Sequence, residues 1–151
     1  MVTESTEQLL RQKAIERFWE SLPSTWNQVR NNLRSIASEK FEISVEQFHI
    51  LRHIRKGAKS VSDLADLRKI SRPAISQAVD VLVEKGLVAR QQDVKDRRFV
   101  NLLLTPAGDE LLTHIFQENR AWMIDKMQSL SDSDLETIIH AMELLSRAFS
   151  E

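Results

Sequence analysis

The chain has 151 residues, of which 42% are hydrophobic and 28% are charged, as is ordinary for a single soluble globular domain. It has no apolar run of the roughly 18 residues that a membrane-spanning helix needs, and the acidic N-terminus MVTESTEQLLRQ lacks the pattern of a secretion signal. The absence of cysteine excludes disulfides, thiolate metal sites and cysteine redox sensing. These features together predict a cytoplasmic protein with no membrane partner.

The distribution of charge is more informative than the net charge of −1, which by itself argues against nucleic-acid binding. Residues 44–105 contain 12 Lys and Arg against 7 Asp and Glu, whereas the flanking segments are acidic. A basic centre between acidic flanks predicts one module that contacts a polyanion and another with a different role. A basic excess of this size would also suit an ordinary solvated surface.

The N-terminal third of the chain contains two amphipathic helical patterns, in residues 4–22 and 24–38, and we expect Pro23 to interrupt the helix between them. A third helix is predicted to begin after Ser44, because Gln47 lies at the spacing of a capping box, and to end at Gly57.

The centre of the chain has the element order of a helix-turn-helix followed by a hairpin. A short helix over 60–68 and the turn Lys69-Ile70 lead to a helix that begins at Ser71 and is closed by Gly86. Residues 87–92 and 99–104 then read as two strands joined by a charged loop. A long helix from Thr105-Pro106 to about residue 128 and a final helix from Ser131 or Asp132 complete a mainly α fold with a small β-hairpin wing.

The helix after Ser71 has a short, polar outer face opposite its apolar stripe of Ile75, Val79 and Leu82. In a helix-turn-helix the second helix enters the major groove, where Gln can pair with adenine and Asp can accept from cytosine. The candidate base and phosphate contacts on this helix are Ser71, Arg72, Pro73, Ser76, Gln77 and Asp80. The same pattern also fits an amphipathic core helix with a solvated side.

The hairpin loop gathers Lys95, Arg97 and Arg98 at one tip. A guanidinium inserted into a narrow minor groove benefits from the enhanced negative potential there, so the loop is a candidate DNA contact. The alternative is an exposed turn whose surface ion pairs contribute little to stability.

Residues 44–108 resemble the winged helix-turn-helix of the multiple-antibiotic-resistance regulator (MarR) family. The matching segments are SVSDLADLRKISRPAISQAVDVLVEKGLVAR and DVKDRRFVNLLLTPAG, and the Asp-x-Arg wing tip followed by Leu-Thr-Pro-x-Gly is the specific part. The resemblance implies that Arg98 enters the minor groove, that Asp96 orients it, and that Lys95 and Arg97 contact phosphates. It also implies one domain over 1–151, in which helices of 4–38 and 106–150 dimerise around a DNA-binding region at 44–105.

Large apolar residues on the terminal helices agree with a homodimer, which would place two recognition helices about one DNA turn apart on a roughly palindromic operator. An intrachain helical core is the alternative. The family resemblance further implies a repressor released by a small aromatic or amphipathic ligand, commonly an aromatic acid. The conceivable lining of its pocket is Trp26, Arg30, Leu33, Phe48 and Arg52, which would otherwise be ordinary core and surface residues.

Two other functional classes compete with DNA binding. His49 and His53 have a spacing that can hold a metal if Glu46, His114 or His140 joins them, but paired surface histidines usually bind nothing, and we predict no metal and no cofactor. No nucleophile elbow, phosphate loop, dinucleotide motif or HExxH is present, so we predict that the protein is not an enzyme. A winged-helix module that binds protein without specific DNA binding is the remaining alternative.

Overall fold

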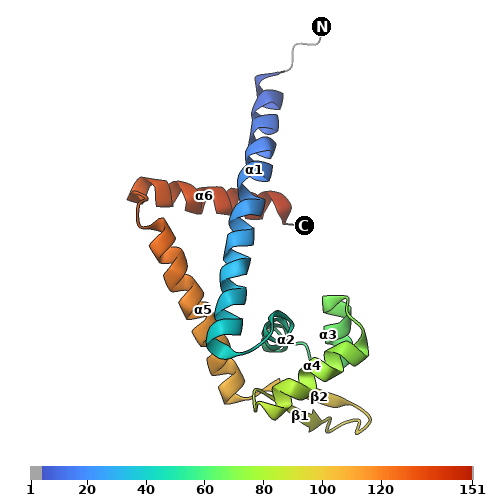
Figure 1. The fold of residues 1–151 in the computed structure, drawn as a ribbon. Coiled ribbons are helices and arrows are strands. Elements are labelled where there is room, and N and C mark those ends of the chain that lie inside the picture. The colour runs from blue at the N-terminus through green and yellow to red at the C-terminus, as the bar shows by residue number, and fades with distance from the viewer. Residues whose placement is uncertain (1–4, 151) are drawn as a thin grey trace. The chain divides into compact units, whose positions relative to one another are not determined.

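The computed structural model describes residues 5–150 and contains six α-helices and one two-stranded antiparallel hairpin within that range. The mainly helical winged fold predicted from the sequence is therefore confirmed (Figure 1). The elements are α1 (Thr6–Ser35), a π-helical turn (Ile36–Lys40), α2 (Val45–Arg55), α3 (Val61–Arg68), α4 (Arg72–Glu84), β1 (Val88–Gln92), β2 (Val100–Leu104), α5 (Pro106–Met127) and α6 (Asp132–Phe149).

The chain divides into two compact units, one that ends at Asn119 and one that begins at Arg120. The first unit contains α1 to α4, the hairpin and the first part of α5, and the second contains the rest of α5 and α6. The organisation of the whole chain as one domain stays a prediction.

The prediction that Pro23 interrupts the first helix is wrong, because α1 runs through it as one helix of 30 residues. Proline removes a single backbone donor, so only one hydrogen bond of a long ladder is lost. Neighbouring hydroxyls bond the helix backbone, with Ser21 Oγ donating to the Arg17 carbonyl and Thr25 Oγ1 donating to the Ser21 carbonyl. The remaining hydrogen bonds of this 30-residue helix thus outweigh the one that is lost.

The helix boundaries in the centre of the chain follow local capping chemistry. Ser44 and Gln47 form the predicted capping box of α2, and Ser60 and Asp63 form another at α3. The turn after α3 is tight because Lys69 adopts a left-handed conformation with φ of 53°, and Ser71 then caps α4. Helix α4 is closed by Gly86, whose φ of 71° few other residues tolerate.

The core of the first unit fastens the hairpin to the helices. A two-stranded hairpin is marginal by itself in water, but here Val88 of β1 and Leu102 of β2 are both only 2% exposed. The Leu102 N–H donates to the Lys59 carbonyl before α3, which holds one further segment against β2. The helical members of this core are Ile36, Ala37, Phe48, Ile50, Leu51, Ile54, Leu64, Ala65, Ile75, Val79, Leu82, Leu112 and Ile115.

Two of the large apolar residues of the terminal helices that were expected to form a dimer surface, Ile115 and Phe116, instead pack in or against this core. Ile115 is fully buried, and the Phe116 ring packs against Phe48 with 5.7 Å between ring centroids. For this part of α5 the alternative of an intrachain core is the correct one. The first turns of α5 therefore pack within the first unit and do not form a free surface.

The start of α5 is locked to the start of the hairpin through the Thr-Pro-Ala-Gly segment. Thr105 donates its N–H to the Leu87 carbonyl at 3.1 Å and its hydroxyl to the Gly86 carbonyl at 2.6 Å. One turn later, Gly108 passes so close that a Cβ there would lie 2.1 Å from the Leu87 carbonyl oxygen. The glycine is required because backbone, which cannot rotate away, occupies the space of any side chain.

We therefore expect Gly108→Ala to lower the free energy of unfolding by about 1–3 kcal/mol, since α5 must shift away from the hairpin to relieve the overlap. Chemical denaturation followed by circular dichroism measures this change. Ala107→Ser, on the exposed side of the same turn, is the control and should change stability by less than about 0.5 kcal/mol. Equal stability of the Gly108→Ala variant and the wild type would show that the close approach is not maintained in solution.

Candidate nucleic-acid interface

Helix α4 presents a polar face to solvent. Its inner side buries Ile75, Val79 and Leu82 completely, and at 100° per residue the positions between them point outward. The outer positions are the predicted ones: Ser71, Arg72, Pro73, Gln77 and Asp80 are exposed and Ser76 is partly exposed. The structure thus brings all six predicted residues of this helix onto one accessible surface.

Asp80 has a partner that the sequence did not reveal. Its Oδ1 accepts a hydrogen bond from Nη2 of Arg90 on β1 at 2.6 Å, so the two side chains form an ion pair between the outer face of α4 and the hairpin. The sequence pattern makes Asp80 a candidate base contact, although its negative charge would be repelled by nearby phosphates. Because Arg90 neutralises the carboxylate, Asp80 needs no DNA base to do so.

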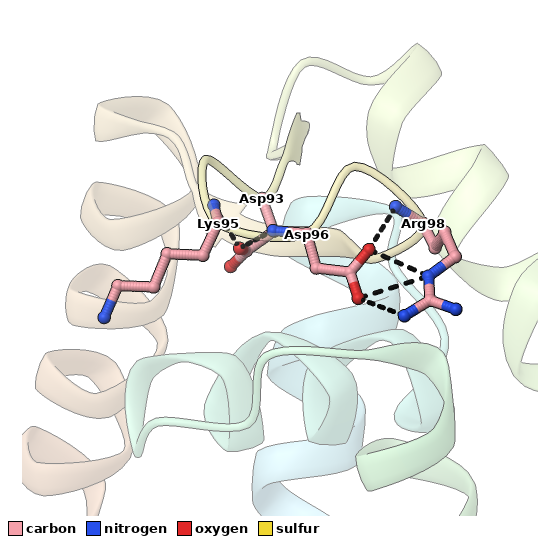
Figure 2. Close-up of polar contacts among 4 residues, drawn as sticks. All are labelled: Asp93, Lys95, Asp96 and Arg98. Atoms are coloured by element: carbon pink, nitrogen blue, oxygen red, sulfur yellow. Dashed lines mark hydrogen bonds and ion pairs between the residues drawn. The ribbon is translucent and has the colours of Figure 1, made fainter.

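The wing tip holds Arg98 in a fork made by Asp96 (Figure 2). Arg98 donates from Nε to Oδ1 of Asp96 at 3.0 Å, from Nη2 to Oδ2 at 2.7 Å, and from its backbone N–H to Oδ1 at 3.1 Å. These bonds lower the pKa of Asp96 and raise that of Arg98, the side-chain bond being the main cause of both shifts. The Arg98 side chain is nevertheless 87% exposed, so its guanidinium is fixed in direction and still accessible.

The loop that carries this fork is organised by Asp93. Its Oδ1 accepts the backbone N–H groups of Lys95 at 2.8 Å and Asp96 at 3.0 Å, and its Oδ2 accepts from the Asn101 amide at 3.0 Å. The pKa of Asp93 is lowered by these bonds, chiefly that from the Asp96 N–H. We missed this role, although an Asp that opens a tight polar loop is the usual signature of an Asx-turn.

The other basic residues of the wing are accessible. Lys95 and Arg97 are exposed, and the Lys95 side chain extends away from the Asp96–Arg98 fork in Figure 2. The Arg97 carbonyl accepts from the Gln92 amide at 3.1 Å, which fixes the backbone at this position but leaves the direction of the side chain unspecified. The loop at 93–98, which the structure describes in full, thus presents three cations, and Arg98 is the one among them that a carboxylate holds.

A second group of predicted residues also comes together. Trp26, Arg30 and Leu33 of α1 and Phe48 and Arg52 of α2 line one small cavity of about 40 Å³ in the first unit. The remaining lining residues are Arg34, Ala37, Val45 and His49.

The polar groups in this cavity are incompletely bonded. His49 Nδ1 and Arg52 Nε are buried and have no hydrogen-bond partner among the residues that the structure describes. Burial, together with the charges of Arg68 and Arg52, lowers the pKa of His49 to about 4, so its imidazole is neutral near pH 7. The cavity therefore carries three arginines and an uncharged histidine, with no acidic residue in its lining.

The carboxylate that could have joined the two histidines of α2 is already bound. Arg68 of α3 donates from Nε and Nη2 to the two oxygens of Glu46, at 3.0 and 3.1 Å. Within residues 5–150, no three His, Asp or Glu side chains lie close enough together to hold a metal ion. A further finding over the same described residues is that no helix combines the length and apolarity needed to cross a membrane.

A helix-turn-helix whose second helix is exposed, followed by a hairpin with a basic tip, defines a winged helix-turn-helix DNA-binding fold. Comparison with known proteins agrees with this class. The sequence profile of the MarR family matches residues 41–98. The chain is 28% identical over 127 residues to the helix-turn-helix transcriptional regulator YpoP of Bacillus subtilis, covering 83% of this chain and 89% of that protein.

A second Bacillus subtilis regulator of this type, YdgG, is 31% identical over 113 residues, which cover 72% of each chain. Among solved structures, a mutant of S. aureus MepR bound to an oligodeoxyribonucleotide superimposes with a TM-score of 0.68 at 18% identity, covering 88% of this chain and 98% of that one. This chain therefore belongs to the MarR family of winged helix-turn-helix transcriptional regulators. Such proteins are regulators rather than enzymes.

The bonds to Asp93 give a titration test of the wing. Because the lowered pKa means that the ionised carboxylate is the form held in the fold, these bonds should persist until the pH falls through a value below the ordinary 3.8. We expect an NMR titration of the Asp93 carboxyl to have its midpoint below 3.8, and Asn101→Ala to raise it by removing one donor. Asn31→Ala, on the exposed surface of α1, is the control; an unchanged Asp93 midpoint in the Asn101 variant would contradict the contact.

Proposed function

We propose that this protein binds a roughly palindromic operator as a homodimer, represses transcription from it, and is released by a small aromatic acid. The observation that carries the DNA-binding part is the Asp96–Arg98 fork beside the polar face of α4. A guanidinium held by two bonds and still 87% exposed is suited to enter a minor groove while α4 lies in the neighbouring major groove. We assign base contacts to Ser76 and Gln77, with Ser71, Arg72 and Pro73 at the helix start and Lys95 and Arg97 on phosphates.

Support for a homodimer comes from the terminal helices. The structure describes all 30 residues of α1, and none of them is buried. Five large apolar residues of this helix are more than half exposed to solvent: Leu9, Leu10, Ile15, Trp19 and Trp26. The described helix α6 likewise buries none of its residues and exposes Ile139 and Phe149. Burial of such surface contributes about 25 cal/mol per Å², which favours association with a second copy.

Repression is the regulatory effect that needs no contact of the protein other than the one with DNA. A dimer seated on two half-sites covers a promoter and excludes polymerase without any further contact. Such an operator mirrors the two-fold symmetry of its protein, with half-sites one helical turn apart.

Support for an acidic effector comes from the cavity between α1 and α2. Three arginines and two unpartnered buried polar atoms favour an anion, and Trp26 and Phe48 offer aromatic faces to a ring. Since ligand cavities usually measure about 300–1,000 Å³, the 40 Å³ present here must widen when a ring enters. A ligand that binds one spacing of α1 and α2 better than another shifts the protein toward that state.

DNA binding is tested by gel shift with the intergenic DNA upstream of the protein's own gene, across a salt series. We expect Arg98→Ala to bind about tenfold more weakly or worse, and the slope of log K against log salt to fall by about 1, because one cation no longer displaces a counterion. Arg17→Ala removes a similarly exposed, ion-paired arginine from α1 and should bind like the wild type. Two chains per duplex are expected from the dimer.

A protein-interaction module predicts a different result. It would tolerate Arg98→Ala, and the wild type would not distinguish the intergenic duplex from a scrambled one. If a genome-wide binding selection then also enriches no sequence, operator binding is rejected and the winged fold is left as a protein-binding surface.

The effector proposal is tested with benzoate, using acetate as the non-aromatic control. We expect millimolar benzoate to change the tryptophan fluorescence of a variant in which Trp19 and Trp122 are replaced by Phe, so that Trp26 alone reports, and to weaken the protein–DNA complex. Arg52→Gln should lose both effects because the cavity loses an anion-binding group. Lys56→Gln removes an exposed charge from the end of the same helix and should respond like the wild type. Equal responses of the Arg52 and Lys56 variants would reject this cavity as the binding site.

A further inference from the structure

The ion pair between Asp80 and Arg90 lies where the recognition helix meets the hairpin. Asp80 shares the outer face of α4 with Ser76 and Gln77, four and three residues earlier. The Arg90 Nη2 reaches this face from β1 and lies 2.6 Å from Asp80 Oδ1. The guanidinium is thereby held at the same surface as the candidate base contacts.

The register of the hairpin explains how a strand residue reaches that surface. Arg90 lies opposite Leu102, and Val88 lies opposite Leu104, so these four side chains share one face of the sheet. Val88 and Leu102 are buried in the core. Arg90 is one step beyond the core on the same face, and its long side chain emerges between the hairpin and α4.

The charges and exposure decide what this arginine can do. Arg90 keeps 36% of its side-chain area exposed and Asp80 keeps 53%, so neither charge is buried and the pair contributes little to stability. The bond to Asp80 uses one of the five N–H donors of the guanidinium. The other donors are available to an anion beside α4, where the backbone of a duplex lies when this helix occupies its major groove.

We propose that Arg90 binds a DNA backbone phosphate next to the recognition helix, and that Asp80 positions this guanidinium rather than reading a base. The inference rests on the proposed operator binding and adds one phosphate contact between α4 and the wing. It also explains an acidic residue on a DNA-facing surface, because its charge is neutralised from within the protein.

The test measures affinity, salt dependence and base preference on a duplex that the wild-type protein enriches from a random library. Arg90→Ala should bind about tenfold more weakly without a change in base preference. Its slope of log K against log salt should fall by about 0.9, so that raising salt from 50 to 200 mM costs it about three- to fourfold less affinity than it costs the wild type. Arg90→Lys keeps a cation at this position and should retain the wild-type slope.

The role of Asp80 is read from the double variant. Without Arg90, an unpaired Asp80 repels the phosphates, so Asp80→Asn combined with Arg90→Ala should bind more tightly than Arg90→Ala alone. Asp80→Asn by itself should leave base preference unchanged. A base reader predicts the opposite: the double variant would bind more weakly than Arg90→Ala, and Asp80→Asn would relax preference at one position.

Two outcomes overturn the inference. One is an Arg90→Ala variant with the affinity and salt slope of the wild type, and the other is the base-reader pattern for Asp80. Thermal unfolding of each variant separates loss of contact from loss of fold, and Arg90→Gln provides a second neutral variant of closer size. If the wild type enriches no sequence at all, operator binding itself fails, which is distinguishable from a normal wild type with an indifferent Arg90.

Discussion

The packing of a two-stranded hairpin onto three helices is the constraint on which this structure depends. Neither strand could persist in water without a covered face, and Val88 and Leu102 are covered by the core that α2, α3 and α4 build. The contact of Gly108 with the Leu87 carbonyl then sets where α5 starts relative to the hairpin. Recognition helix, hairpin and the first turns of α5 are consequently parts of one packed body.

The electrostatic design resolves the apparent conflict between a net charge of −1 and DNA binding. The cations that we propose to contact DNA are few, and carboxylates hold two of them. Arg98 is aimed by Asp96 and Arg90 is held by Asp80, so two carboxylates on the basic surface lie beside the arginines whose directions they fix. The main effect of Asp96 and Asp80 is therefore to fix the direction of an arginine side chain that would otherwise be flexible.

Elements whose ends depend on neighbouring residues were predictable from the sequence. Ser44, Ser60 and Ser131 start their helices with local hydrogen bonds, and Gly57 and Gly86 end theirs through positive φ. The effect of Pro23 was overestimated because the local rule for proline does not weigh the long hydrogen-bond ladder in which it sits. The Asp80–Arg90 and Arg68–Glu46 pairs were out of reach, since each depends on the packing of separate elements. The Asp93 turn, by contrast, is local and was available from the sequence.

The hydrogen bonds that hold the wing loop all join residues within 92–101. A loop of this kind loses its conformational entropy when the chain folds, whereas an unstructured basic loop would lose it when the complex forms. In the proposed complex with DNA, little further ordering of this loop is then needed. The heat-capacity change of complex formation should accordingly follow the surface removed from water at the wing, without the large additional contribution that accompanies folding on binding.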